Sequence, residues 1–336
     1  MPFRDICGQD RPLRLLRRAW AGGRLAQAYC FTGPAGVGKR STAVALAQAV
    51  KCLSPLTAPP GEDTPDACGA CRACARIAAG QHPDVTLIAP EEKTVITIDQ
   101  IRGLAARASL RACEGTAKIW ILDPAHDMQE PAANAFLKTL EEPPAGSLFL
   151  LVTTAFSALL PTIRSRCQEV RFTALGEEHL RTILARRGRN AEEAAAAAAA
   201  AGGSAERALA PDARERCAAR ARLVEDVWSA LGSLPALLDQ ADRLAKDREN
   251  LEDALEALLA FTRDAAVAGI GPPAASLLPA ERRTEVARVT GDAPLAALLR
   301  VHAVQREAQQ ALAWHAQPRF AAERMLLRMR QAIGRK

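Results

Sequence analysis

The sequence predicts an α/β domain built on a parallel sheet, followed by a part that contains only helices. Short apolar segments alternate with helical patterns in the first half, as in strands joined by crossover helices. The strand-like segments are 28–32, 85–88, 118–122 and 148–152. From about Thr173 the strand signals end, and helical patterns continue to the C-terminus.

We divide the 336 residues into three domains, since one domain usually holds about 100–200 residues. The predicted ranges are 1–172 for the α/β domain, 173–210 for a small helical lid and 211–336 for an all-α domain. Ser204 is a suitable N-cap inside the lid. The last domain shows helical patterns at 222–231, 251–268 and 295–333, the last of which is broken near Pro318.

The composition indicates a cytoplasmic globular protein, with 49% hydrophobic and 24% charged residues. We expect no association with a membrane, because no uncharged apolar run of about 18 residues occurs and the N-terminus lacks the apolar core of a signal peptide. The formal net charge of +6 is compatible with a nucleic-acid partner, but an ordinary basic protein would also carry it.

Four clustered cysteines predict a structural zinc site in an insertion at about 52–74. Cys52 is followed, after fifteen residues, by Cys68, Cys71 and Cys74 in a CxxCxxC pattern. Cysteines two residues apart can turn both sulfurs toward one tetrahedral Zn²⁺, and four thiolates close the coordination shell. The remaining cysteines occur singly, as small core residues do: Cys7, Cys30, Cys113, Cys167 and Cys217.

The stretch GPAGVGKRS at 33–41 predicts a degenerate phosphate-binding loop. Gly33, Gly36, Gly38 and Lys39 lie between a predicted strand and a predicted helix, where backbone amides can face an anion. Arg40, however, stands where the pattern GxxxxGK[S/T] requires a hydroxyl ligand for Mg²⁺. Whether the loop binds ATP or ADP is open at this stage, and Arg40 could replace the metal's charge.

The strand KIWIL at 118–122 supports the same interpretation. It leads to Asp123, a candidate metal ligand, but no glutamate follows to orient an attacking water molecule. General-base contributions are typically about 10² to 10⁴ in rate. The two defects together predict that this chain does not hydrolyse ATP by itself.

Several ordered motifs resemble the clamp-loader branch of the AAA+ ATPases. They are QAYCFTGPAGVGK at 27–39, the CxxCxxC insertion, GQHPD at 80–84, IDQIRGL at 98–104, AANAFLKTLEEPP at 132–144, LLVTT at 150–154 and PTIRSRC at 161–167. The resemblance covers the first half of the chain. It implies an AAA+ domain with a parallel sheet, a helical lid and an all-α collar domain that joins subunits in a ring.

Within this family, the damaged nucleotide site is similar to that of delta-prime subunits and differs from that of gamma/tau motor subunits. The resemblance gives Arg166, in the SRC sequence, the role of an arginine finger that reaches a neighbour's γ-phosphate in trans. It places Thr153 or Thr154 at the sensor-1 position. In the lid segment GSAERAL at 203–209, Glu206 stands where the family has an arginine.

The resemblance also implies a set of partners and a surface for DNA. The partners are gamma/tau and delta clamp-loader subunits, the sliding clamp and, through the complex, primed DNA. Arg107 and Arg111 are expected on one face of a helix toward DNA phosphates, although a solvated basic face explains them nearly as well. The segment 318–330 resembles the last collar helix, whose apolar side chains suit a core: Phe320, Met325, Leu326 and Met329.

The resemblance therefore implies a clamp-loader subunit of a DNA polymerase holoenzyme, itself without ATPase activity. Two other functions are compatible with parts of the pattern. A divergent gamma/tau-type ATPase would hydrolyse ATP in a manner that depends on Lys39. An independent zinc-bearing nucleic-acid-binding protein would bind DNA tightly without partner subunits.

Overall fold

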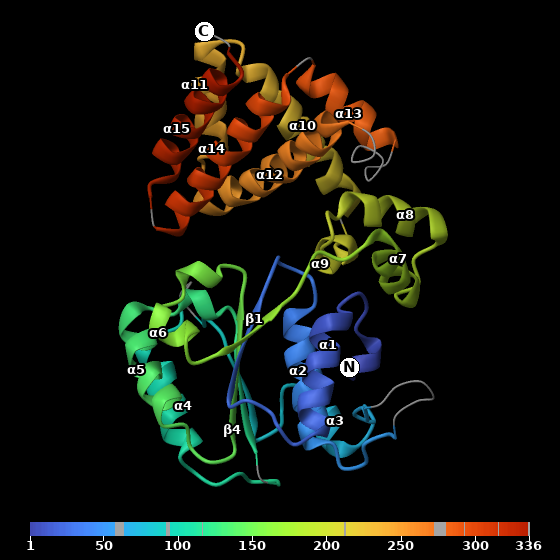
Figure 1. Ribbon diagram of the computed structural model, residues 1–336, viewed down its shortest axis with the longest axis vertical. Helices are drawn as coiled ribbons and strands as arrows, with labels where there is room; N and C mark the ends of the chain where they lie inside the picture. Colours follow the sequence, from blue (N-terminus) through green and yellow to red (C-terminus); the bar gives the residue numbers. More distant parts are fainter. Residues whose placement is uncertain are drawn as a thin grey trace. The chain divides into compact units, whose positions relative to one another are not determined.

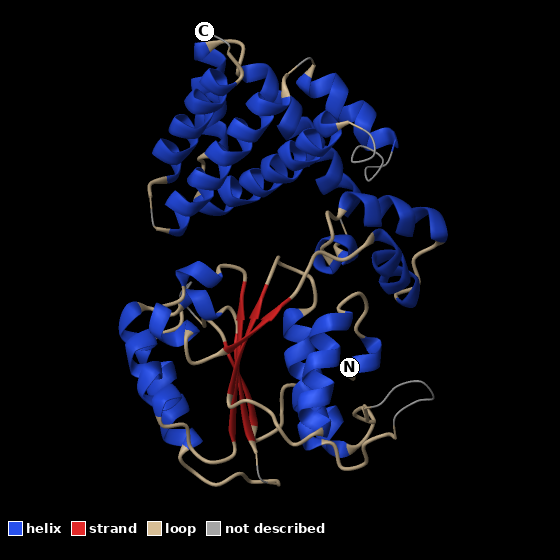
Figure 2. Ribbon diagram, in the orientation of Figure 1, coloured by secondary structure: helices blue, strands red, loops and turns tan. Residues whose placement is uncertain are grey.

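The computed structural model describes residues 1–57, 64–91, 95–115, 117–211, 213–271, 280–291, 293–314 and 316–334. The chain forms two compact units, Met1–Ala213 and Arg214–Lys336. Figure 1 gives the course of the chain, and Figure 2 shows that all strands of the sheet belong to the first unit.

A five-stranded parallel sheet forms the centre of the first unit. Its strand order is β2-β3-β4-β1-β5, and each neighbouring pair is parallel. The four predicted strands are confirmed, and a fifth strand follows the SRC sequence directly. The bounds are β1 Ala28–Thr32, β2 Val85–Ile88, β3 Lys118–Leu122, β4 Ser147–Thr153 and β5 Gln168–Arg171.

Helices cover both faces of this sheet (Figure 1). On one face lie α1 Asp10–Ala21, α2 Lys39–Lys51 and α3 Arg72–Ala78, and on the other lie α4 Ile98–Ala108, α5 Glu130–Glu141 and α6 Pro161–Arg164. Side chains alternate along the strands, so Tyr29 and Phe31 enter one core while Ala28 and Cys30 enter the other. Burial of both faces explains why the strands are continuous apolar runs.

Three short helices form the predicted lid region within the first unit. They are α7 Glu177–Arg186, α8 Ala191–Ala200 and α9 Ala205–Leu209. Leu180 and Leu184 pack with alanines of α8 and α9 in a hydrophobic cluster of their own. These helices belong to the same compact unit as the sheet, and the finer division into three domains stays a prediction.

The described part of the second unit contains only helices, which confirms the predicted fold class. The helices are α10 Ala213–Ala230, α11 Leu234–Leu244, α12 Arg248–Ile270, α13 Ala280–Thr290, α14 Leu295–Ala313 and α15 Pro318–Ala332. Their core includes Trp228 and Phe261, whose ring centroids are 5.8 Å apart in an edge-on arrangement. None of the described helices is both long enough and apolar enough to cross a membrane.

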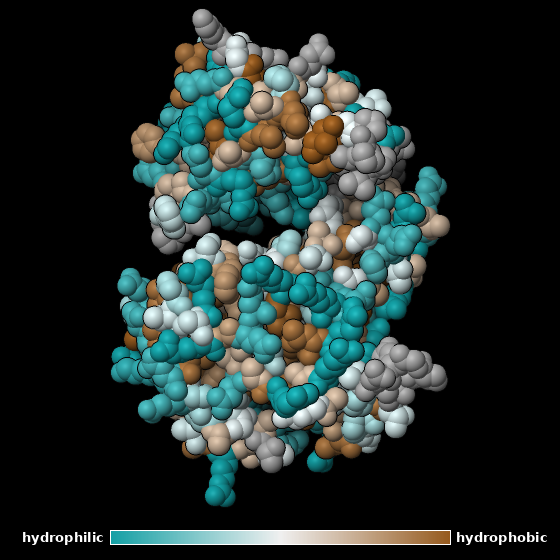
Figure 3. Space-filling view, viewed as in Figure 1, coloured by the Kyte–Doolittle hydropathy of each residue, from teal (hydrophilic) through white to brown (hydrophobic). Residues whose placement is uncertain are grey.

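The prediction for α15 is right for three of its four apolar side chains. Met325, Leu326 and Met329 are buried, whereas Phe320 is 66% exposed. The buried positions repeat at helical spacing on one face, and Phe320, five residues before Met325, lies about 140° away around the helix. Figure 3 shows further apolar residues on the visible surface, and Trp314 and Ile270 are also exposed in this unit.

The prediction that Arg107 and Arg111 share one face of a helix is wrong. α4 ends at Ala108, so Arg111 lies beyond the helix. The Ser109 hydroxyl donates a hydrogen bond to the Ala106 carbonyl oxygen at 2.8 Å, a local bond that competes with continuation of the helix. The Arg107 guanidinium stacks over the Trp120 ring, 5.1 Å from its centroid.

Candidate functional site

The glycine-rich turn between β1 and α2 has the geometry of a phosphate loop. Gly33, Gly36 and Gly38 have φ angles of 137°, 69° and 96°, which are unfavourable for residues other than glycine. α2 begins at Lys39, with Gly38 as its N-cap residue. The structure thus brings the four predicted loop residues together at a helix N-terminus, where backbone amides can face an anion.

The side chain of Lys39 is turned onto its own loop. It is 5% exposed, and its Nζ donates hydrogen bonds to the carbonyl oxygens of Gly33 and Pro34 at 2.7 and 2.5 Å. Burial lowers the pKa of Lys39 to about 8, although the negative charges of Asp123 and Glu206 oppose this shift. The cation of the loop is therefore already solvated by protein oxygens.

Arg40 is paired with the acid at the end of β3. Its Nε lies 3.6 Å from Asp123 Oδ2. Burial raises the pKa of Asp123, and the positive charges of Arg40 and Lys39 counteract that shift. The residue that replaces the expected magnesium-ligating hydroxyl thus contacts the carboxylate that would hold the metal.

The lid contacts the loop directly at Gly36. The backbone amide of Ala205 donates a hydrogen bond to the Gly36 carbonyl oxygen at 2.8 Å. A Cβ atom built on Gly36 would overlap Ser204 Oγ and lie 2.8 Å from Cβ of Glu206. Glycine is therefore needed here for close approach of α9 as well as for its backbone conformation.

Pro124 stands directly after Asp123, where a water-orienting carboxylate is expected, and His126 follows two residues later. His126 follows Asp123 in a short 3-10 helix, Ala125–Asp127. Its Nδ1 is 3.0 Å from Thr153 Oγ1, and its Nε2 is 3.3 Å from Thr154 Oγ1. Both threonines proposed for the sensor-1 position therefore contact this ring, which crosses from β3 to the end of β4.

Arg166 lies on the segment between α6 and β5, away from the chain's own loop. Its Nη2 donates to Glu141 Oε1 at 2.8 Å, and its Nη1 donates to the Thr162 carbonyl oxygen at 3.0 Å. Its side chain is 36% exposed, and that of Glu141 is 50% exposed. The guanidinium is thus held at the surface by an ion pair that water can reach.

The four clustered cysteines come together as a group that could hold one metal ion. The Sγ atoms of Cys52, Cys68, Cys71 and Cys74 all lie within 4.8 Å of one another. Cys71 is the N-cap residue of α3, and Cys74 lies within that helix. Four thiolates at tetrahedral spacing around a Zn–S distance of about 2.3 Å would fit such a cluster.

Backbone amides point at these sulfurs. The Cys68 amide is 3.2 Å from Cys52 Sγ, and the amides of Ala70 and Cys71 are 3.4 and 3.2 Å from Cys68 Sγ. The bonds from Cys71 and Ala70 hold the pKa of the Cys68 thiol below its ordinary value. Burial raises the pKa of Cys52 and Cys74 instead. Donors on two sulfurs favour the thiolate form that metals require.

Two residues of these sites were not among the predicted ones. Glu141 belongs to the sequence LEEPP, which was noted as a motif but without a role for the acid. The sequence pattern assigns no role to His126 and indicates only that no glutamate follows Asp123. The position of His126 three residues after Asp123 could have indicated proximity, whereas the contact of Glu141 with Arg166 depends on the packing of α5 and α6.

Comparison with protein families matches the region that contains these sites. The model of a family described as "DNA polymerase III, delta subunit" matches residues 8–176, about half of the chain. DNA polymerase III subunit delta' of Pseudomonas aeruginosa is 44% identical over 149 residues, which are 44% of this chain and 43% of that protein. The same subunit of Bacillus subtilis is 36% identical over 167 residues, 50% of this chain and 48% of that protein.

The similarity extends to a second kind of subunit and to solved structures. DNA polymerase III subunit tau of Escherichia coli is 36% identical over 179 residues, 53% of this chain and 26% of that protein. The chain thus spans less than half the length of these curated relatives. The structure of a gamma subunit-related protein from Thermotoga maritima is 18% identical with a TM-score of 0.42, and it covers 95% of this chain and 99% of that chain.

We expect Gly36→Ala to weaken the contact between α9 and the loop. The left-handed backbone costs about 1–2 kcal/mol for alanine, and the overlap with Ser204 Oγ adds to that cost. The measurements are the free energy of unfolding in urea and the amide hydrogen exchange of α9, which should become faster.

Gly23→Ala is the matched control for this change. Gly23 has a similar φ of 63°, but a Cβ there would meet nothing within 4 Å. Equal losses of stability in both variants, with unchanged exchange in α9, would show that the lid contact contributes nothing.

We expect the purified full chain to contain about one zinc ion per molecule and Cys71→Ser to lose it. Loss of the metal should lower the Tm by about 5 °C or more, because the metal holds an otherwise irregular segment. Elemental analysis and thermal unfolding give the two readouts. Cys113→Ser, at an exposed cysteine outside the cluster, should keep both values. Full metal content in Cys71→Ser would exclude this coordination.

Proposed function

We propose a function from the premise that this chain belongs to the DNA polymerase III delta subunit family, whose model matches about half of it. The proposed function is that of a delta-prime-type clamp-loader subunit, which helps to open a sliding clamp and load it on primed DNA. The identity to two delta' subunits over the first half supports this assignment.

Within such a complex, the chain's own phosphate loop would not hydrolyse ATP. The pair of Arg40 with Asp123 at 3.6 Å supports this, because it occupies the metal-binding carboxylate with a protein cation. The segment after Asp123 supports it as well, since Pro124 stands where a carboxylate base would be needed and the His126 ring is hydrogen-bonded to Thr153 and Thr154. Both nitrogens of the ring are engaged by hydroxyl groups.

The chemical contribution of the chain would come from Arg166, acting in a neighbouring gamma/tau-type active site. The observation that carries this proposal is the surface position of its guanidinium, 2.8 Å from Glu141 and distant in sequence from the loop. Exchange of Glu141 for a partner's γ-phosphate would keep the guanidinium paired with an anion. An arginine finger supplied in trans contributes about 10³ to 10⁵ in rate in related phosphoryl transfers.

The partners proposed for the rest of the chain follow from surfaces that the structure describes. Exposed apolar side chains of the helical unit, including Phe320 and Trp314, suit a collar packed against gamma/tau and delta subunits. Arg107 on α4 would contact DNA phosphates in a salt-dependent way. The cysteine cluster is proposed to hold a structural Zn²⁺.

We expect Arg166→Ala to lower the DNA- and clamp-stimulated ATPase of the reconstituted complex at least about 10-fold, without loss of assembly. The steady-state rate of phosphate release and the elution of the complex on gel filtration measure the two effects. Arg181→Ala, which removes an exposed lid arginine paired with Glu177, should leave the rate unchanged. An unchanged rate in Arg166→Ala would refute the proposed finger.

A gamma/tau-type ATPase is the second candidate function, because the tau subunit of Escherichia coli is also similar to this chain. Turnover by the chain alone separates the two candidates. We expect no ATP hydrolysis above background and no difference between the wild type and Lys39→Ala. Hydrolysis that disappears in Lys39→Ala would establish the second candidate and overturn the first.

A further inference from the structure

β5 is an edge strand with one side open. It pairs with β1 alone, since the sheet order places it last. The Phe172 amide donates to the Thr32 carbonyl oxygen at 2.7 Å, so the backbone groups of Val170 also point toward β1. Alternation along a strand then directs the N–H and C=O groups of Glu169 and Arg171 away from the sheet. The described residues contain no sixth strand beside them.

The next outward backbone position is already occupied by a side chain that imitates a peptide group. Gln9 Nε2 donates to the Thr173 carbonyl oxygen at 2.7 Å, and the Thr173 amide donates to Gln9 Oε1 at 3.3 Å. A primary amide carries the same donor and acceptor as a peptide bond. Gln9, which is 1% exposed, therefore supplies at Thr173 the hydrogen bonds that an added strand would make. It leaves the outward groups of Glu169 and Arg171 without such bonds.

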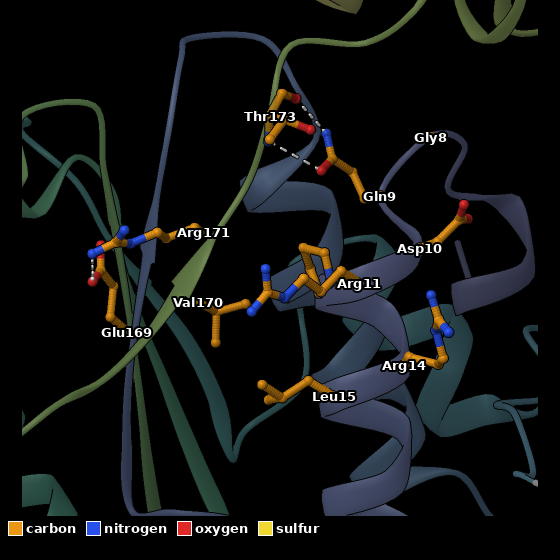
Figure 4. A pocket seen from close by; sticks show the side chains of 11 residues that line it. Gly8, Gln9, Asp10, Arg11, Arg14, Leu15, Glu169, Val170, Arg171 and Thr173 are labelled. Carbon is orange, nitrogen blue, oxygen red and sulfur yellow. Dashed lines mark hydrogen bonds and ion pairs between the residues drawn. The ribbon is translucent and has the colours of Figure 1, made fainter.

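Beyond Gln9 the open edge of β5 faces a hollow of about 660 Å³. Figure 4 shows this hollow between β5 and α1, with Arg11 pointing from the helix toward Val170. Leu15 contributes an apolar surface on the same side. The lining residues are Gly8, Gln9, Asp10, Arg11, Pro12, Arg14, Leu15, Glu169, Val170, Arg171 and Thr173.

Cationic side chains lie on both faces of the sheet at the open edge, where they could contact both faces of an added strand. Arg11 lies on the α1 side, and within the described part of the chain it forms no ion pair. Arg171 lies on the opposite side, with a side chain that is 79% exposed although it contacts Glu169 at 2.9 Å. The carboxylate of Asp10 points away from β5 (Figure 4). An occupant with carboxylates on alternate faces would therefore match both cations.

We propose that this hollow is a docking site for an extended acidic peptide segment of a partner protein, which adds to the sheet as a strand beside β5. The peptide backbone pairs with the outward groups of Glu169 and Arg171, and its carboxylates pair with Arg11 and Arg171. An apolar side chain covers Leu15. Main-chain hydrogen bonds supply affinity in this mode of recognition, and alternate side chains supply specificity. The site needs neither a nucleotide nor a metal.

The test uses the full chain and a fluorescein-labelled peptide of about ten residues in which pairs of glutamates alternate with pairs of valines, so that both faces of the extended peptide carry carboxylates. We expect saturable binding by fluorescence polarisation and slower amide hydrogen exchange at Glu169 and Arg171. A peptide with lysine in place of glutamate should bind at least about 10-fold more weakly. A peptide with proline in place of every valine keeps its carboxylates but lacks backbone donors on both edges of the strand, so it should lose binding as well.

Paired variants separate strand addition from attraction between charges. Arg171→Ala keeps the outward backbone donor, whereas Arg171→Pro removes it and is compatible with an edge strand. We expect Arg171→Pro to bind the peptide at least about fivefold more weakly than Arg171→Ala. Arg11→Glu should weaken binding about 10-fold, and the exposed Arg102→Glu on α4 is its charge-matched control.

Three results would overturn the proposal. The first is equal binding of the lysine peptide, and the second is equal binding of the proline peptide, which would indicate a simple anion site. The third is a loss of affinity that is the same in Arg102→Glu as in Arg11→Glu. Arg11→Glu and Arg171→Ala both keep the backbone of β5, so a folding defect in Arg171→Pro would leave these comparisons decisive.

Discussion

The parallel order of β3, β4, β1 and β5 determines where the glycine-rich loop, Asp123, Thr153 and Arg166 lie. Parallel strands place their carboxyl ends along one edge, so the loop after β1, Asp123 after β3 and Thr153 at the end of β4 meet there. The same pairing places the segment before β5, with Arg166, at the other end of the strands. Sheet polarity alone thus separates the chain's own phosphate loop from its proposed contribution to a neighbour.

Electrostatic pairing within the chain satisfies the charged side chains of the glycine-rich loop. Lys39 is satisfied by loop carbonyl oxygens and Arg40 by Asp123, and the lid brings the charge of Glu206 close to Lys39 and Asp123. A buried cation without a partner would be costly, so a loop that has lost its metal ligand gains from these internal contacts. The loop glycines remain necessary even so, because Gly36 permits the close approach of the lid.

Two features on the surface of the first unit differ from this internally satisfied loop. The ion pair of Arg166 with Glu141 is exposed, and exposed pairs contribute only about 0–1 kcal/mol, so the guanidinium can change partners at little cost. The outward edge of β5 is likewise paired at Thr173 by Gln9 but open at Glu169 and Arg171. The Arg166 guanidinium and the outward backbone groups of β5 are therefore available to a partner chain.

The sequence alone determined the class of fold, four of the strands, the glycine-rich loop and the cysteine cluster, because each depends on residues close together in the chain. Periodicity identified the strands, and the CxxCxxC spacing brings sulfurs together over a few residues. Only the tertiary structure decided which residues far apart in the chain meet: Ser204 with Gly36, His126 with Thr153, Glu141 with Arg166, and Gln9 with Thr173. Local patterns cannot specify these pairs, since they arise when the lid, α1 and α5 pack against the sheet and its loops.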